Sequence, residues 1–132
     1  MSWTYLMLSA AIAGLDEAVK KRIPDPPVKN TGFAMNRMGR HQGFVAAVSV
    51  VMTAGCMAEL IFGKHADKLG LSLVLGGALS NTYDRVVRKY VVDYLPAGRV
   101  YYNLSDVAIF AGFAVLIMKA FSEGELGEAW ER

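Results

Sequence analysis

The chain has 132 residues, of which 54% are hydrophobic and 20% are charged, and its net charge is +2. The charged share is below the roughly one quarter typical of soluble domains, and the length fits a single domain. The small net charge and the lack of a basic stripe argue against nucleic-acid binding. The only cysteine, Cys56, excludes an internal disulfide, and the two histidines, His41 and His65, have no ligand-spaced partners, so no metal site is expected.

Four apolar segments alternate with short charged clusters, as membrane spans joined by loops do. We expect spans at about residues 3–19, 43–63, 69–87 and 105–121. The second is the clearest, because Phe44 to Phe62 has nineteen residues and one charge, Glu59, and about 20 residues cross the hydrocarbon core. Its few polar residues, Ser49 and Thr53, do not form the water-facing stripe of a soluble amphipathic helix. The sequence therefore predicts an all-α membrane protein, a four-span helical bundle in one domain over residues 1–132.

The first span is expected to remain uncleaved, because no basic region of the signal-peptide type precedes it. The connection between spans one and two, residues 20–42, contains Pro24, Pro26 and Pro27. Proline excludes helix at these positions, so we expect a small extended or irregular segment there. The short stretch 63–68 is predicted to be a tight turn, and residues 122–132 an acidic tail.

Small residues mark the third span. Gly76, Gly77 and Ser80 lie near its middle. Such residues let the backbones of membrane helices approach closely. We therefore expect neighbouring helices to pack tightly against this span.

The conspicuous polar residues fall at one face of the predicted bundle. With four antiparallel spans, the end of the first, the start of the second, the end of the third and the start of the fourth meet at the same membrane face. The polar residues at this face are Asp16, Asn30, Asn81, Asp84, Arg85, Asp93, Asn103 and Asp106. Ionisable residues near membrane depth are costly and usually face a bundle interior or a wet cavity, where they mark function. The sequence therefore predicts a functional site at this face.

Several of these residues also have a structural interpretation. Asp84 and Arg85 would form an ion pair that closes a helix end. Asp106, or Ser105 before it, would cap the fourth helix by accepting hydrogen bonds from free backbone N–H groups. Asp93 would be a solvated loop residue. Spacing alone does not decide between these roles and a catalytic pair of Asp93 and Asp106.

Several motifs, taken together, resemble a known family. The stretches "GGALSNTYDR", "VVDYL" and "YYNLSD" occur in this order. They resemble the GGAxGNxxDR, VxDF and FNxAD motifs of the lipoprotein signal peptidases, or signal peptidase II. Upstream, "LDEAVK" is similar to the family's D-x-x-x-K and "NTGFAM" to its N-x-G-x-A segment. The resemblance covers about Leu15 to Gly112 and implies the same four-span layout.

The resemblance implies that Asp93 and Asp106 are the catalytic pair of an aspartic membrane endopeptidase. It implies that six residues support the site or bind substrate: Asp16, Asn30, Asn81, Asp84, Arg85 and Asn103. The implied reaction removes the signal peptide from a lipid-modified bacterial prolipoprotein, just before the diacylglyceryl-cysteine. Two carboxylates at close range share a proton, so one activates water while the other donates, and no metal or other cofactor is needed. Since a coupled pair titrates together, the base and the acid are not assigned.

Some positions depart from the family pattern. Ser80 stands where the family usually has glycine, Ser105 where it has alanine, and Tyr94 and Tyr102 where it favours phenylalanine. The connection between spans one and two is also shorter than usual, and in the family this segment contributes a small sheet over the site. The tyrosines between the two aspartates are interpreted as interfacial anchors on a folded-back loop.

The resemblance implies a multi-pass protein of the bacterial cytoplasmic (inner) membrane with its site toward the extracytoplasmic face. The charge distribution favours the opposite orientation, because ten of the fourteen Lys and Arg lie in residues 20–40 or 85–99, at the site face, and the positive-inside rule places such a face in the cytoplasm. We follow the resemblance, since basic side chains also contact anionic lipid headgroups. The expected partners are a lipid-modified prolipoprotein and membrane lipids, and the chain is expected to be monomeric.

Two other functions stay open at the level of sequence. The shortened first connection and the altered small residues suggest a non-catalytic relative that binds lipopeptides or signal peptides. A small proton-coupled membrane transport or assembly subunit would use buried carboxylates to carry protons, but this function leaves Asn81 and Asn103 unexplained.

Overall fold

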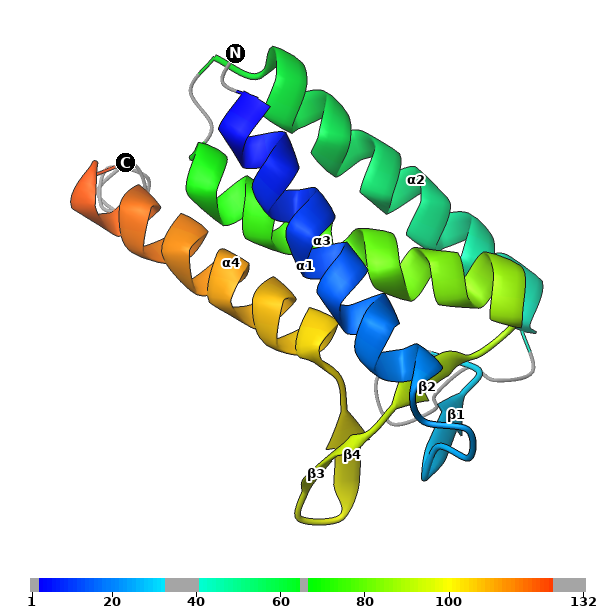
Figure 1. Ribbon diagram of the computed structural model, residues 1–132. Coiled ribbons are helices and arrows are strands. Elements are labelled where there is room, and N and C mark those ends of the chain that lie inside the picture. Colours follow the sequence, from blue (N-terminus) through cyan, green and yellow to red (C-terminus); the bar gives the residue numbers. More distant parts are fainter. Residues whose placement is uncertain (1–2, 33–40, 65–66, 125–132) are drawn as a thin grey trace.

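Long helices form a bundle, and short strands gather at one end of it (Figure 1). The computed structural model describes residues 3–32, 41–64 and 67–124. The helices are α1 (Trp3–Lys21), α2 (Gln42–Phe62), α3 (Lys68–Tyr83) and α4 (Leu104–Ser122), and a π-helical turn, η3 (Asp84–Arg88), continues α3. Their bounds agree with the four predicted spans to within a few residues. The end of the "NTGFAM" segment, His65 and most of the acidic tail lie outside the described residues.

The central helix of the bundle is α3, which packs against α1, α2 and α4. Its small residues lie at these contacts. A Cβ atom at Gly76 would lie 2.8 Å from the Cβ of Ile12 on α1, and one at Gly77 would clash with the carbonyl oxygen of Ser105 on α4. The predicted close approach of neighbouring helices at this part of the chain is confirmed.

The outer faces of α2 and α4 carry large apolar side chains that the bundle leaves exposed. Val51 and Met52 on α2 are 69% and 68% exposed, and Phe110 and Met118 on α4 are 73% and 70% exposed. Among the described residues, α2 and α4 are the two helices long and apolar enough to cross a membrane. Contiguous apolar surface of this kind marks contact with another apolar phase, and hydrocarbon suits it. That α1 and α3 also cross the membrane stays a prediction.

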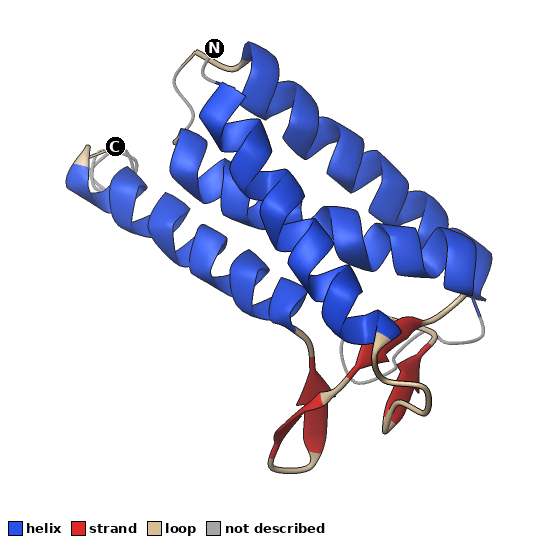
Figure 2. Ribbon diagram, viewed as in Figure 1, coloured by secondary structure: helices blue, strands red, loops and turns tan. Residues whose placement is uncertain are grey.

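The strands of the described residues, shown in red in Figure 2, lie at the end of the bundle where α1 ends and α4 begins. They are β1 (Val28–Asn30), β2 (Val91–Asp93), β3 (Leu95–Ala97) and β4 (Val100–Tyr102). The first strand lies in the connection where the prolines predict extended backbone, and it pairs antiparallel with β2, which follows η3. Strands β3 and β4 form a hairpin, so the predicted folding back between the two aspartates is confirmed.

The all-α prediction is therefore incomplete, because three of the four strands follow the third span. Runs of three residues are too short for an alternating pattern to identify them. The hairpin also needs a residue with positive φ at its turn, which Gly98 provides with a φ of 64°. At the other end of the bundle lie the start of α1 and the end of α4 (Figure 1). The strands thus cover only the end at which the predicted polar residues meet.

Substituting Gly77 tests whether α3 and α4 must touch through their backbones. Gly77→Ala is expected to lower the free energy of unfolding by about 1–3 kcal/mol, because the new methyl group meets a backbone oxygen that cannot rotate away. The measurement is a denaturant titration in detergent micelles. Gly55→Ala on α2 is the matched control, since a Cβ there meets nothing within 4 Å, and it is expected to leave stability unchanged or slightly raised. Equal effects of the two substitutions would contradict this account.

Candidate active site

The two predicted catalytic aspartates come from different elements and meet beside one asparagine. Asp93 is the last residue of β2 and is 3% exposed, while Asp106 lies in the first turn of α4. Between them, the side-chain Nδ2 of Asn103 donates to Oδ1 of Asp93 at 3.1 Å, and its backbone N–H donates to Oδ2 of Asp106 at 3.1 Å. The interpretation of Asp93 as a solvated loop residue is therefore wrong.

The start of α4 is closed by a capping box that includes Asp106. Asn103 is the N-cap residue, and its Oδ1 accepts a hydrogen bond from the backbone N–H of Asp106 at 2.8 Å. The Asp106 carboxylate returns a bond by accepting from the Asn103 backbone N–H. Ser105, the other predicted cap, instead donates to Asp16. The capping role of Asp106 is confirmed, although the N-cap residue is Asn103. It leaves Oδ1 of Asp106 available, and this oxygen accepts from Nδ2 of Asn81 at 3.1 Å.

Three asparagines orient the two carboxylates. Oδ1 of Asn81 accepts from Nδ2 of Asn103 at 2.9 Å and from Nζ of Lys20 at 3.2 Å, so its Nδ2 must point toward Asp106. On the other side, Nδ2 of Asn30 donates to Oδ2 of Asp93 at 3.3 Å. Asn30 is held in turn by the Gly32 backbone N–H, which donates to its Oδ1 at 3.1 Å. Each asparagine is thereby fixed by its acceptor side and presents its donor side to the site.

The electrostatic environment favours a protonated Asp93. Burial, together with the nearby negative charge of Asp106, raises the pKa of Asp93 to about 7. The hydrogen bond from Asn30 and the positive charges of Lys20 and Arg85 act in the opposite direction. The pKa that results puts proton exchange at Asp93 close to neutral pH.

Behind the aspartates lies a buried ion cluster centred on Lys20. Its Nζ lies 2.9 Å from Oδ2 of Asp16 and 2.8 Å from Oδ2 of Asp84, and all three side chains are fully buried. Arg88 completes the cluster by pairing with Asp84 and with Glu17. Among the described residues, Asp84 therefore forms ion pairs with Lys20 and Arg88. This corrects the expectation that it pairs with Arg85. Buried charges are tolerated only when they are paired in this way.

The ion cluster is also attached to the strand that carries Asp93. Oδ2 of Asp84 accepts a hydrogen bond from the backbone N–H of Val92 at 3.1 Å. The resemblance singled out Asp84 and included Lys20 in the D-x-x-x-K motif, but it gave no role to Lys20, Glu17 or Arg88. Their signal in the sequence was the i, i+4 spacing of Asp16 with Lys20 and of Asp84 with Arg88, which is common on helices.

Arg85 follows Asp84 in η3. Its guanidinium donates to the carbonyl oxygen of Gly32 at 3.3 Å. Together with Asn81 and Asp106 it lines a cavity of about 230 Å³, whose other walls include Met52 and Thr53 on α2. This cavity gives space for a ligand directly beside one of the two aspartates.

Three hydroxyl groups also reach the ion cluster, and one of them corrects a sequence prediction. Tyr94, interpreted as an interfacial anchor, donates from its hydroxyl to Oδ1 of Asp16 at 2.6 Å. Ser80 and Ser105 donate to Oδ2 of the same carboxylate.

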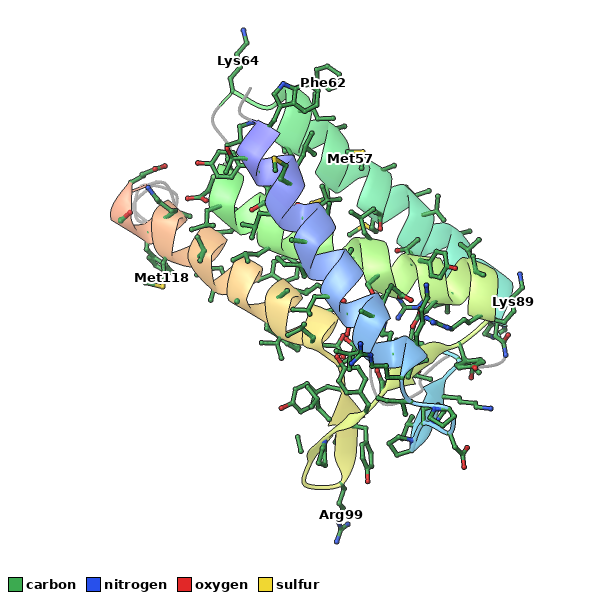
Figure 3. The ribbon with its side chains drawn as sticks, in the orientation of Figure 1. Met57, Phe62, Lys64, Lys89, Arg99 and Met118 are labelled. Atoms are coloured by element: carbon green, nitrogen blue, oxygen red, sulfur yellow. The ribbon has the colours of Figure 1, made fainter. Side chains whose placement is uncertain are left out.

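The side chains of this end are drawn in Figure 3, where Lys89 and Arg99 extend away from the bundle. In the described part of the chain, no group of three or more His, Cys, Asp or Glu side chains is placed to hold a metal ion.

Comparison with known proteins supports a common family. The family model described as signal peptidase (SPase) II matches residues 8–122. The lipoprotein signal peptidase of Alteromonas mediterranea is 34% identical over 105 residues, which cover 70% of this chain and 56% of that protein. The lipoprotein signal peptidase of Brevibacillus brevis is 33% identical over 103 residues, with coverage of 74% and 69%. The aligned part thus spans between about half and two thirds of these relatives.

The fold has a solved counterpart. A bacterial membrane enzyme, solved by the in meso method at 2.3 Å resolution, superimposes with a TM-score of 0.76 at 20% sequence identity. The superposition covers 92% of this chain and 89% of that one. At this level of identity the likeness concerns the fold.

Replacing Lys20 tests how much the ion cluster contributes to the stability of the fold. Lys20→Met is expected to lower the free energy of unfolding by about 3–5 kcal/mol, because Asp16 and Asp84 lose their shared cation while remaining buried. Lys21→Met, one position further on α1 and exposed, is the matched control and is expected to change stability little. Both are measured by denaturant titration in detergent micelles. A Lys20→Met protein as stable as the control would show that the cluster does not hold this end together.

Proposed function

Because the chain belongs to the signal peptidase II family, we propose that it removes signal peptides from lipid-modified bacterial prolipoproteins as an aspartic endopeptidase. The proposed catalytic pair is Asp93 and Asp106. The observation that carries the proposal is that Asn103 bonds to both carboxylates, although they belong to β2 and α4. A pKa of about 7 at Asp93 adds to it, because a pair that keeps one proton near neutral pH can act as both acid and base.

The proposed mechanism needs only this pair and a water molecule. The ionised carboxylate accepts a proton from the water as its oxygen attacks the carbonyl carbon of the scissile peptide bond. The protonated carboxyl group donates its proton to the carbonyl oxygen. When the tetrahedral intermediate collapses, the C–N bond breaks, the protonated carboxyl group gives its proton to the leaving amine, and the ionised carboxylate takes a proton from one hydroxyl group of the intermediate, which restores the pair with one proton. The acid and base roles belong to the pair as a whole and not to Asp93 or Asp106 individually, because the two carboxyl groups titrate together.

The supporting residues keep this geometry without taking part in bond breaking. Asn30, Asn81 and Asn103 donate to the carboxylates and limit how far each can rotate. Arg85 brings a positive charge near the pair. Preorganised donors of this kind need no reorganisation as charge develops during the reaction.

The cavity beside Asp106 suggests where the peptide lies. Its walls combine apolar side chains such as Met52 and Ile109 with the hydroxyl groups of Ser49 and Thr53. An extended peptide with small side chains fits such walls, and the exposed apolar face of α2 next to the cavity suits the lipid-modified end. We place the site at the extracytoplasmic face of the inner membrane and propose that the chain acts as a monomer on prolipoprotein within the lipid bilayer.

The structure weakens the arguments for the two alternative functions. The shortened first connection, which suggested a non-catalytic relative, still supplies β1, which pairs with β2 and presents Asn30 to Asp93. A proton-carrying subunit left Asn81 and Asn103 unexplained, and both now have bonds to the aspartates. These observations favour the peptidase.

Removing either acid tests the proposal directly. Asp93→Asn and Asp106→Asn are each expected to lower the cleavage rate of a purified, lipid-modified precursor by at least about 10³-fold, because a catalytic pair works as a unit. Mass spectrometry of the products identifies the cleaved bond. Asp25→Asn, an exposed position near β1, is the control and is expected to cleave at the wild-type rate. Full activity of Asp93→Asn or Asp106→Asn, in protein that unfolds like wild type, would exclude the pair.

The pH dependence of cleavage provides a separate test. Because the pKa of Asp93 is raised to about 7, the pair loses its proton donor as pH rises through this value. We therefore expect kcat/KM to be highest below about pH 7 and to fall about tenfold per pH unit well above it. The measurement is the initial cleavage rate from pH 5 to pH 9. An undiminished rate at pH 9 would contradict the proposal that a proton on the aspartate pair is needed for cleavage.

A further inference from the structure

One buried carboxylate connects the segments that carry the two aspartates. Asp16 on α1 is fully buried. Its Oδ1 accepts from the Tyr94 hydroxyl at 2.6 Å, and its Oδ2 accepts from Ser105 Oγ at 2.5 Å. Hydrogen bonds of a hydroxyl to a charged oxygen are short and strong, and burial strengthens them further.

The two donors are the immediate neighbours of the proposed catalytic pair. Tyr94 follows Asp93 at the end of β2, and Ser105 precedes Asp106 in the first turn of α4. Besides the direct connection through Asn103, a longer route from one aspartate to the other therefore runs through Tyr94, Asp16 and Ser105 in series. A second, parallel route exists, because the Tyr94 hydroxyl also accepts from the backbone N–H of Leu104 at 3.1 Å.

The connecting carboxylate is held on a rigid support. Nζ of Lys20 lies 2.9 Å from Asp16 Oδ2, and Lys20 lies one turn further on the same helix. That helix packs closely on α3, where a Cβ atom at Gly76 would lie 2.8 Å from the Cβ of Ile12. Functional groups keep their geometry when their supporting residues are locked by packing and hydrogen bonds. Asp16 meets this condition.

Packing alone does not require the two hydroxyl groups, because phenylalanine and alanine would fill nearly the same space as Tyr94 and Ser105. Both hydroxyl groups, together with that of Ser80, donate to the same carboxylate. Donors from separate segments that meet at one buried acceptor indicate a shared role.

We propose that Tyr94 and Ser105 are positioning residues of this peptidase, and that through Asp16 they set the spacing between Asp93 and Asp106. The inference rests on the proposed function and deepens it. It gives Tyr94 and Ser105 no contact with substrate. Their effect is on the alignment of the pair, where small displacements of reacting groups reduce the rate strongly.

The experiment uses the arrangement in series. Tyr94→Phe breaks both routes, so it is expected to lower kcat for cleavage of the lipid-modified precursor by about tenfold, with KM within about twofold of wild type. Ser105→Ala breaks one route and is expected to lower kcat by about threefold. In the double variant the connection is already broken by Tyr94→Phe, so adding Ser105→Ala is expected to change kcat by less than about twofold.

Non-additivity separates positioning from a general structural role. Two substitutions that only destabilised the fold would act independently, and their effects on kcat would multiply. Thermal unfolding in detergent verifies that each variant is folded at the assay temperature. Tyr101→Phe on the same hairpin and Ser122→Ala on the same helix lie outside this hydrogen-bond network and are expected to keep wild-type kcat.

The outcomes of this experiment are distinguishable. Suppose that the wild type is active. The positioning role is then overturned if the effects of the two substitutions on kcat multiply, if kcat is unchanged in both single variants, or if only KM changes. Each of these results leaves the proposed function intact. If wild type does not cleave the precursor, or if Asp106→Asn cleaves it, the proposed function fails and the positioning role fails with it.

Discussion

The buried ammonium group of Lys20 is the interaction on which this end of the bundle depends. Without it, Asp16 on α1 and Asp84 after α3 would place two carboxylates in an environment that strongly disfavours uncompensated charge. With it, both lie within 2.9 Å of one cation. The segments that carry the proposed catalytic pair are attached to these two carboxylates, because Val92, next to Asp93, bonds to Asp84 and Ser105, next to Asp106, bonds to Asp16. The site is therefore assembled around a charge balance that it shares with the fold.

Structural and chemical roles coincide in the residues that join α4 to the strands. The first turn of a helix has backbone N–H groups without partners inside the helix. Asn103 and Asp106 satisfy two backbone N–H groups there through the capping box, and their remaining polar atoms orient toward Asp93 and Asn81. The capping and the catalytic interpretations of Asp106 are thus compatible, since one carboxylate oxygen serves each. A helix start is well suited to this, because it holds a carboxylate in a fixed direction.

The division of the molecule into apolar faces and one polar end follows from the cost of charge in hydrocarbon. Large side chains such as Phe110 and Met118 remain exposed along the outside of α4, whereas the paired charges collect where helix ends and strands meet. The strands pair their own backbone groups there. The proposed hydrolysis of a lipid-anchored peptide would use this combination, with the substrate entering from the bilayer and the water from the polar end.

Local features of the sequence were sufficient for the helices and for the placement of the eight predicted polar residues at one end of the bundle. Apolar runs of sufficient length predict helices regardless of what surrounds them, and the alternation of chain direction brings Asp16, Asn81 and Asp106 to one end. The pairing within that end was beyond the sequence. Lys20 and Asp84 are 64 positions apart, and whether they meet depends on the rotation of α1 against α3, which the contact at Gly76 decides. The pairing of β1 with β2 and the inward direction of the Tyr94 hydroxyl have the same origin. Such contacts are set by the packing of whole elements, and no local pattern of residues encodes them.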